Sequence, residues 1–289
     1  MIAAGFDYHV PRSVADAIKL LADLGPDAKL LAGGHSLLPM MKLRFAQPSH
    51  LVDLGKIADL RGISQVGNEI RIGAMTTEHD LLHSALLAAK VPLLVEGAGW
   101  IADPQVRYKG TIGGDISHGD PGNDQPALML ALDASFVLKG PGGERVVKAD
   151  SFFLGLYSTL LEPGEILTEI RLPIPAVGSG WSYQKLKRKT GDFATAATAV
   201  LLEMKGANVA QVRIALTNAG ATALKASAAE DYLAGKPIND ASLNEAARLA
   251  MSICDPTPDQ RGDVAYKVAM CGEMTRRALQ AAHARATKA

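Results

Sequence analysis

The sequence predicts an α+β protein with two domains, and three observations carry this prediction. The chain has 289 residues, a length that suits two domains of ordinary size. As far as residue 177, short apolar segments alternate with segments of helical periodicity. Beyond that point, three strand-like segments are followed only by helix-like ones. The uncharged stretch 174–180 contains proline and glycine, and we therefore expect domains at 1–177 and 178–289.

The first part of the N-terminal domain, about residues 1–54, is predicted to alternate helices and strands. Ser13 is a typical N-cap, and the apolar residues after it recur at a period near 3.6 as far as Leu24. A strand over 29–32 then leads through Gly33 and Gly34 to a brief helix. Ser36 is placed to cap this helix, which ends near 43, and a strand over 50–54 follows.

The second part, about 55–177, is expected to hold further strands and helices around one long polar loop. Residues 103–125 show no apolar period and include five glycines within GTIGGDISHGDPGND. A loop of this length in a compact domain is usually functional or disordered. The other predicted elements are a strand over 69–74, helices over 77–82, 92–102 and 126–133, a hairpin over 134–149 and a strand over 165–173.

The C-terminal domain is predicted to be a three-stranded antiparallel sheet followed by helices. The last two strands are joined by a hairpin around 205–209. The alanine-rich segments after them have helical spacing. The strands are expected at 181–189, 194–204 and 211–220, and the helices at 222–234, 241–254 and 264–286.

The composition excludes several classes of protein. Lys plus Arg equals Asp plus Glu at 30 each, so no basic excess indicates nucleic-acid binding. No apolar run approaches the roughly 20 residues that span a bilayer, and the N-terminus does not resemble a signal peptide. Two cysteines, Cys254 and Cys271, provide no disulfide framework and no iron-sulfur cluster. We therefore expect a cytoplasmic protein.

The motif Ala32-Gly33-Gly34-His35-Ser36 lies between a predicted strand and a predicted helix. Paired glycines let the backbone approach an anion and present successive N–H groups to it, and a helix N-terminus adds further donors. When the motif is taken alone, a simple tight turn is the better explanation.

A second glycine pair occurs in Thr111-Ile112-Gly113-Gly114-Asp115, inside the long polar loop. Three carboxylates and His118 are close by in sequence, and such groups hydrogen-bond hydroxyls and phosphate oxygens. Two glycine motifs in one domain together suggest a cradle for a dinucleotide. The same carboxylates would suit a hard metal ion, but their spacing is not that of an EF-hand, and we rank the metal site well below the cradle.

Two other motifs carry less weight. Gly97-Ala-Gly99-Trp-Ile-Ala102 matches a GxGxxA dinucleotide fingerprint, but it follows a helix start at Pro92 instead of a strand, so we reject it. The basic run 185–189 would place Lys185, Lys187 and Lys189 on one face of a strand, which is most simply a solvated face. No serine, cysteine or P-loop signature of catalysis is present.

Read together, three segments resemble the FAD-binding medium subunits of the molybdenum hydroxylases, the xanthine dehydrogenase family, and within it the aerobic carbon monoxide dehydrogenase type. They are AGGHSLLPMMKLRFAQP (32–48), DPQVRYKGTIGGDISHGDPGND (103–124) and KLKRKTGDFATA (185–196). The resemblance covers essentially the whole chain. It implies a vanillyl-alcohol-oxidase-type (PCMH-type) FAD-binding fold of two α/β subdomains, followed by a C-terminal α+β domain.

The resemblance also implies which residues contact FAD. Residues 32–36 and 111–115 would hold the diphosphate and ribityl chain, and side chains at Gly33 or Gly114 would crowd the cofactor. Phe193 would lie beside the isoalloxazine ring, and Lys185 is the first candidate to stabilise negative charge on reduced flavin. The expected contacts are Ala32, Gly33, Gly34, His35, Ser36, Thr111, Ile112, Gly113, Gly114, Asp115, His118, Gly119, Asn123, Asp124, Leu161, Leu167, Lys185 and Phe193.

The family implies an electron-transfer role in a larger enzyme. A large subunit would carry a molybdenum-molybdopterin cytosine dinucleotide, and a small subunit two [2Fe-2S] clusters, in a dimer of heterotrimers. Electrons from the clusters would pass through FAD to quinone or another acceptor, with at most peripheral contact with the inner face of the membrane. The alternatives are a medium subunit of an aldehyde, nicotine or N-heterocycle dehydrogenase and, in another class, a binding module without redox activity.

Overall fold

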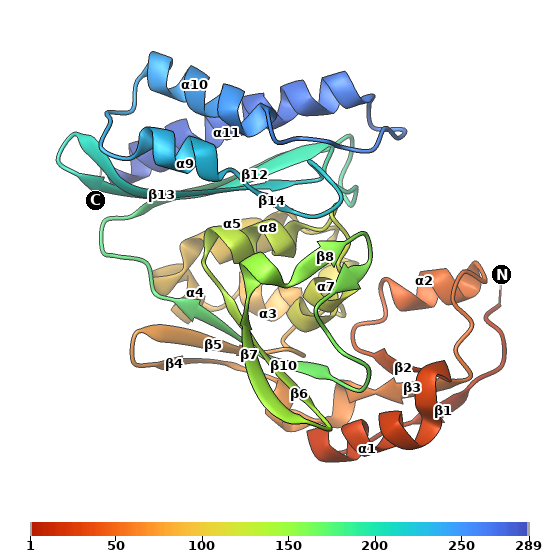
Figure 1. Cartoon of the computed structure of the whole chain (residues 1–289). Coiled ribbons are helices and arrows are strands. Elements are labelled where there is room, and N and C mark those ends of the chain that lie inside the picture. Colours follow the sequence, from red (N-terminus) through yellow and green to blue (C-terminus); the bar gives the residue numbers. More distant parts are fainter. Residues whose placement is uncertain (1, 288–289) are drawn as a thin grey trace.

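The computed structural model describes residues 2–287, which form three layered regions in chain order (Figure 1). The N-terminal region contains a parallel three-stranded sheet in the order β1-β3-β2. Helix α1 begins after its N-cap Ser13, as predicted, and packs Ala17 into a small core with Val52 and Ile57. The elements are β1 (Asp7–His9), α1 (Val14–Leu24), β2 (Ala28–Leu31), α2 (Leu37–Lys42) and β3 (His50–Asp53).

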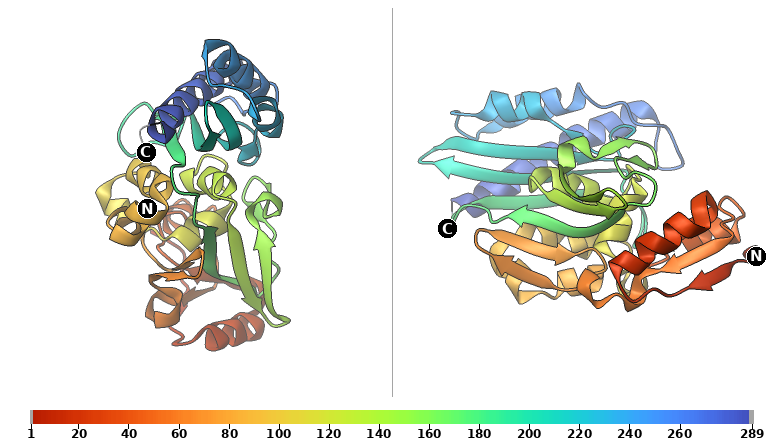
Figure 2. Two further views of the ribbon diagram at one scale, coloured as in Figure 1. Left: turned by 90° about the vertical axis from the view of Figure 1, so that its left-hand side faces the viewer. Right: turned by 60° about the horizontal axis from the view of Figure 1, so that its bottom comes forward.

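The middle region is a five-stranded antiparallel sheet in the order β4-β5-β10-β6-β7, with short helices on one face (Figures 1 and 2). Ile70 and Ile72 of β5 alternate with the partly buried polar residues Glu69 and Arg71 and pack toward the helices. The strands are β4 (Ile63–Val66), β5 (Glu69–Gly73), β6 (Ser135–Gly140), β7 (Gly143–Lys148), β10 (Ile166–Pro173) and a separate pair, β8 (Phe153–Gly155) and β9 (Ser158–Thr159). The helices are α3 (Glu78–Leu82), α4 (Ala85–Lys90), α5 (Pro92–Trp100), α6 (Pro104–Arg107), α7 (Ile112–His118) and α8 (Asp124–Ala131).

The C-terminal region is an antiparallel sheet that is covered on both faces. Ala197, Ala199 and Leu201 of β12 join the core around α5 and α8. Val200 and Leu202 point to the other face and join a core with α9, α10 and α11. This double burial explains the unbroken apolar run in β12. The elements are β11 (Gly180–Leu186), β12 (Ala196–Lys205), β13 (Asn208–Thr217), β14 (Leu224–Lys225), α9 (Ser227–Leu233), α10 (Asp240–Met251) and α11 (Val264–Ala286).

The prediction of one long loop over 103–125 is wrong. The segment contains α6, α7 and the start of α8. Asp103 and Thr111 cap α6 and α7 by accepting hydrogen bonds from Val106 N–H and Gly114 N–H. Ile112 and Ile116, four residues apart, are fully buried on the inner face of α7, but a single apolar pair does not reveal a helical period in the sequence.

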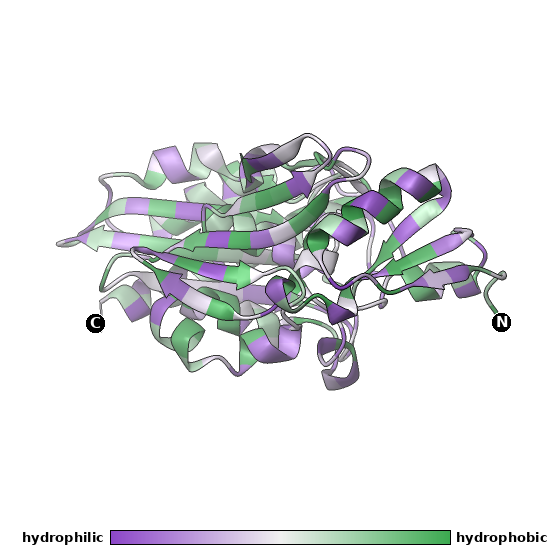
Figure 3. Cartoon of the chain, turned by 90° about the horizontal axis from the view of Figure 1, so that it is seen from below, coloured by the Kyte–Doolittle hydropathy of each residue, from purple (hydrophilic) through white to green (hydrophobic). Residues whose placement is uncertain are grey.

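The C-terminal sheet has four strands in the structure, not three, because the short β14 pairs with β13. Strand β11 ends at Leu186, so Lys187 and Lys189 lie beyond it and the expected row of lysines on one strand face is not formed. Figure 3 shows that hydrophilic and hydrophobic residues alternate along the strands of the open sheet faces. Within residues 2–287, no helix is both long and apolar enough to cross a membrane.

Candidate functional site

A cavity of about 1170 Å³ opens between the N-terminal sheet and the helices of the middle region. It is larger than most small-molecule pockets, which are roughly 300–1,000 Å³. All but two of the residues expected to contact FAD line it, from Ala32 to Phe193. Its walls come from the β2–α2 connection, α7, the segment 161–167 and the segment 191–193. The structure therefore brings together residues from all three sequence segments.

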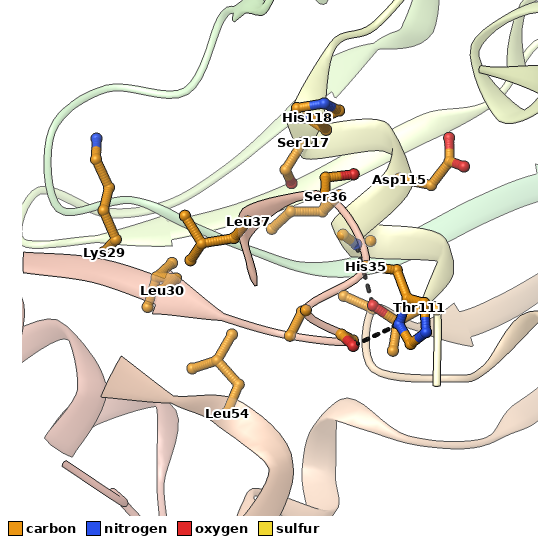
Figure 4. Close-up of a pocket in the computed structure, with 18 of the residues that line it drawn as sticks. Lys29, Leu30, His35, Ser36, Leu37, Leu54, Thr111, Asp115, Ser117 and His118 are labelled. Carbon is orange, nitrogen blue, oxygen red and sulfur yellow. Dashed lines mark hydrogen bonds between the residues drawn. The ribbon is translucent and has the colours of Figure 1, made fainter. Parts of the chain in front are cut away.

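The first glycine segment leaves backbone donors unused at this cavity. Gly34 has a φ of +75°, a left-handed conformation that suits glycine. The N–H groups of Gly34, His35 and Ser36 have no hydrogen-bond acceptor among residues 2–287. Successive free N–H groups at such a bend form a concave site for an anion. His35 Nδ1 lies 2.9 Å from the carbonyl oxygen of Gly33, which orients its ring (Figure 4).

The expected cap at Ser36 is wrong. Ser36 has helical backbone angles, and its side chain makes no capping hydrogen bond to α2. The hydroxyl of Ser36 and the α7 side chains Asp115, Ser117 and His118 lie around the same space in Figure 4. Ser36 is thus free for a ligand instead of being used by its own helix.

The second glycine segment uses its donors inside the protein. The N–H of Ile112 donates to Thr76 O, and that of Gly113 to Ala74 O, at 3.1 and 2.9 Å. The N–H of Gly114 donates to Thr111 Oγ1 at 3.2 Å. The first turn of α7 therefore offers no free donors from these residues to a phosphate. It supplies the side chain of Asp115 to the cavity instead.

The glycines of the two segments also let the segments touch. A Cβ on Gly33 would lie 2.2 Å from the carbonyl oxygen of Lys109, just before the second motif. A Cβ on Gly114 would lie 2.9 Å from Thr111 Oγ1 and 3.3 Å from Ala32 Cβ. A side chain at either position would therefore meet the protein itself first, and the expectation that it would also crowd the cofactor stays a prediction.

Three carboxyl groups form a buried cluster at one wall of the cavity. They belong to Glu78, Asp115 and Asp124, and one ammonium group, that of Lys185, lies among them. Burial raises the pKa of Glu78 to about 8, although a hydrogen bond from Gln125 opposes this. Burial, together with the neighbouring Glu78, raises the pKa of Asp115 well above its usual range. The Glu78 carboxyl therefore holds a proton at neutral pH.

Two oxygens of this cluster have no hydrogen-bond partner among residues 2–287. Glu78 Oε1 and Asp115 Oδ1 are buried and make no hydrogen bond. Buried polar atoms are nearly always paired, and leaving one unpaired costs about 1–3 kcal/mol. Because both residues line the cavity, the missing partners are best supplied by hydroxyl groups of a ligand.

Lys185 is not a free cation. Its Nζ lies 2.6 Å from Asp124 Oδ2, and both side chains are almost fully buried. The other oxygen of Asp124 accepts a hydrogen bond from Tyr183 Oη at 2.5 Å. Burial raises the pKa of Asp124, and Lys185 acts against this rise. Lys185 therefore reaches the cavity as half of a neutral ion pair.

Ile112 and Gly119 do not line the cavity. The side chain of Ile112 is fully buried in the core of the middle region. Gly119 ends α7 in the left-handed conformation and faces Thr159 instead. Both residues were expected to contact FAD because they lie in the motif segment 103–124, and their neighbours in that segment do line the cavity.

The remaining predicted residues lie around the opening. Burial lowers the pKa of His118, whose ring lies 4.9 Å from that of Tyr157. Phe193 is an exposed aromatic side chain in the wall. Asn123, Leu161 and Leu167 also contribute to the lining. Sequence reasoning missed Glu78, Tyr157 and Asp192. Glu78 and Tyr157 lie outside the three motif segments and are brought to the cavity by folding, whereas Asp192 lies within 185–196, next to Phe193, and was given no role.

Comparison with known proteins identifies the fold and the cofactor. The family described as "FAD binding domain in molybdopterin dehydrogenase" matches residues 4–175, and "CO dehydrogenase flavoprotein C-terminal domain" matches 181–282. The chain belongs to the FAD-binding subunits of the molybdopterin dehydrogenases. The predicted PCMH-type FAD-binding fold and the FAD cofactor are thereby confirmed.

Individual relatives of this family are similar over their full length. The chain is 57% identical to the carbon monoxide dehydrogenase medium chain of Hydrogenophaga pseudoflava, and 52% to that of Afipia carboxidovorans, with 99% of each chain covered. A solved carbon monoxide dehydrogenase from H. pseudoflava, which lacks the Mo-pyranopterin moiety, has a chain with a TM-score of 0.98 and 59% identity, again over 99% of both chains. The nicotine 6-hydroxylase medium subunit of Paenarthrobacter nicotinovorans and the glyceraldehyde dehydrogenase medium chain of Sulfolobus acidocaldarius are more distant, each at 34% identity.

The residues present fit the chemistry of FAD. The free N–H groups at 34–36 suit an anionic diphosphate. The unpaired oxygens of Glu78 and Asp115 suit the hydroxyl donors of a ribityl chain. The aromatic and aliphatic side chains Phe193, Leu161 and Leu167 suit a flat, largely apolar ring system.

Proposed function

We propose that this chain is the FAD-binding, electron-transferring medium subunit of an aerobic carbon monoxide dehydrogenase, the oxidoreductase that converts CO and water to CO2. The observation that carries the proposal is the full-length similarity to two carbon monoxide dehydrogenase medium chains, at 57% and 52% identity. The cavity supports the same proposal, because its donors and acceptors suit FAD. Bound FAD supplies the capacity to exchange electrons one or two at a time.

The protein residues would bind and orient this cofactor. The unused backbone N–H groups of Gly34, His35 and Ser36 would donate to the diphosphate oxygens, and the unpaired oxygens of Asp115 and Glu78 would accept from ribityl hydroxyls. The Asp124–Lys185 pair presents a buried polar group without net charge. Burial raises the pKa of Glu78 to about 8, so its carboxyl holds a proton beside the cavity at neutral pH. No side chain in this proposal acts as a nucleophile.

We propose the following partner subunits, electron acceptor and location for this chain. A large subunit holds a molybdenum-molybdopterin cytosine dinucleotide, and a small subunit holds two [2Fe-2S] clusters that deliver electrons to this chain. Two such heterotrimers form a dimer, and the acceptor is a quinone or another external oxidant. The complex is cytoplasmic and touches the inner face of the membrane at most peripherally. Residues 1–177 form the FAD-binding domain and 178–289 the C-terminal domain.

The test is electron transfer in the assembled complex. We expect the complex to reduce a quinone analogue with CO as donor, and we expect flavin bands in its visible spectrum. Turnover of an aldehyde, nicotine or an N-heterocycle without turnover of CO would assign the chain to another enzyme of the family. Absence of flavin from the correctly folded complex after addition of FAD would contradict the redox role altogether.

A further inference from the structure

One segment of the cavity wall comes from the connection between β11 and β12. Gly191, Asp192 and Phe193 of this connection line the cavity. Phe193 is 46% exposed, although it is a large apolar side chain. Tyr157, the other aromatic residue in the wall, contacts the His118 ring. Phe193 is thus an aromatic surface presented to whatever occupies the cavity.

Asp192 anchors this segment through both of its carboxylate oxygens. Oδ1 accepts hydrogen bonds from Arg261 Nη2 at 2.6 Å and from Arg261 Nε at 3.2 Å. Oδ2 accepts one from Arg188 Nε at 2.9 Å. The side chain of Asp192 is only 6% exposed. Although burial opposes its ionisation, these arginines outweigh that effect and lower its pKa to about 2.

Arg261 comes from a distant part of the chain, the connection between α10 and α11. Its guanidinium also lies 5.6 Å from the centre of the Phe193 ring, within the range of a cation–π interaction. Arg261 Nη1 is itself held by Asp259 at 3.1 Å, and Asp259 by the buried Lys267. One arginine of the C-terminal region therefore contacts two consecutive residues of the cavity wall.

The opposite side of Phe193 is fixed as well. Asn218 Nδ2 donates to the carbonyl oxygen of Ala194 at 2.7 Å. The Phe193 ring lies against Gly122, where a Cβ would be 3.4 Å from it. With both neighbours held, the ring has little freedom to leave the wall. A flat aromatic surface held in this way is suited to stack on a planar ligand ring.

We propose that Arg261 is a positioning residue for the flavin: through Asp192 it holds Phe193 against the isoalloxazine ring and keeps that face of the ring covered. This inference rests on the proposed binding of FAD in the cavity. Arg261 itself acts through Asp192 and Phe193, and its role links the C-terminal region to the cofactor site.

The test compares four variants in the assembled, FAD-loaded enzyme: Arg261→Met, Phe193→Ala, the double variant, and Arg248→Met. Arg248 is an exposed arginine of α10 paired with Glu245, so it is the matched control. The readouts are the FAD content, the quenching of flavin fluorescence by iodide and the visible circular dichroism of the flavin. Asp192→Asn is a further variant that preserves shape if Arg261→Met does not fold.

We expect Arg261→Met to retain FAD and to raise iodide quenching about tenfold. Losing the charge-assisted hydrogen bonds to Asp192 should shift the equilibrium between a covered and an uncovered flavin face by about that factor. Phe193→Ala should do the same, and the double variant should add nothing further. Amide exchange in 188–195 should accelerate in Arg261→Met even before FAD is added. Arg248→Met should match the parent protein.

Two results would overturn the proposal. One is parent-like quenching and circular dichroism in both Arg261→Met and Asp192→Asn. The other is an Arg261→Met effect that persists in full in the Phe193→Ala background. Failure of the parent enzyme to bind FAD is a separate result, and it would contradict the proposed function instead.

Discussion

The two glycine pairs look alike in the sequence but differ in what they do in the structure. After β2, Gly34 bends the chain in the left-handed region and leaves successive N–H groups free. At the start of α7, the N–H groups of Ile112, Gly113 and Gly114 are all bonded within the protein. The first segment is suited to bind an anion through its backbone, and the second presents a carboxylate on a rigid helix.

The difference teaches that a glycine motif does not by itself define an anion site. Gly33 and Gly113 are required because backbone atoms of Lys109 and Ala74 lie where their Cβ atoms would be. These glycines bring segments together, and only Gly34 provides a bend with unused donors. Substitutions that change packing, charge, capping or backbone bending one at a time can test this difference between the two glycine segments.

The largest effect is expected for Gly33→Val. Its Cβ would lie 2.2 Å from the Lys109 carbonyl oxygen, so the two segments must separate. We expect a loss of at least about 3 kcal/mol in the free energy of unfolding, the upper end for overpacking, and loss of FAD. Urea unfolding and flavin content measure both. Gly142→Val is the control, because no atom lies within 4 Å of its Cβ position; equal effects at the two positions would refute the packing role.

The next largest effect is the pH dependence of the free energy of unfolding that Glu78, in the cavity wall beside α7, is expected to cause. The folded state raises the pKa of Glu78 to about 8, so it binds a proton that the unfolded chain releases near pH 4.5. Stability from this group is therefore complete at low pH and is lost as pH rises through about 8. Glu78→Gln should remove that loss, on the order of a few kcal/mol at pH 9 relative to pH 5.

Urea unfolding of Glu78→Gln and of the parent protein at pH 5, 7 and 9 measures this difference. Asp231→Asn, a change at an exposed carboxylate, serves as the control. Parallel pH curves for Glu78→Gln and the parent would show that Glu78 is ionised in the folded protein.

The two motif hydroxyls should differ in their effect on stability. Thr111 caps α7, whereas Ser36 makes no capping bond. We expect Thr111→Ala to lower the free energy of unfolding by about 1 kcal/mol and Ser36→Ala to leave it unchanged within about 0.5 kcal/mol. Thermal and urea unfolding compare the two. A larger loss in Ser36→Ala would mean that the caps are assigned the wrong way round.

Gly34→Ala is expected to have a small effect on folding but still to weaken the binding of FAD. At a φ of +75°, alanine costs about 1 kcal/mol of strain, and the nearest neighbour of its Cβ is the adaptable side chain of Leu38. Gly235→Ala has the same strain at a φ of +76° with no near neighbour. The two should lose similar stability, but only Gly34→Ala should weaken FAD binding, as measured by equilibrium dialysis. Equal FAD affinities would contradict the role of this bend.

The sequence predicted those elements that depend on local signals. Helix α1, with Ser13 and Gly25 at its ends, and the hairpin of β12 and β13 are confirmed. The loop prediction for 103–125 failed because α7 is too short for a period to show and has two glycines in its first turn. The motif residues could be found from sequence, since glycine and carboxylate patterns mark them.

The remaining site residues could not be found in this way. Glu78 reaches the cavity because Thr77 caps α3 beside the start of α7, and its burial is a tertiary effect. Arg261 lies 69 positions from Asp192 and has no motif. Whether Lys185 is a free cation or part of an ion pair also depends on α8, which brings Asp124 to it.

Amide hydrogen exchange in the assembled enzyme, first depleted of flavin and then reloaded with FAD, tests most directly how the cavity binds its cofactor. We predict that FAD slows exchange strongly at residues 34–36, whose N–H groups are free, and changes it little at 112–114, which are already bonded. Protection at 112–114 with none at 34–36 would contradict the assignment of the free N–H groups at 34–36 as the donors that bind FAD.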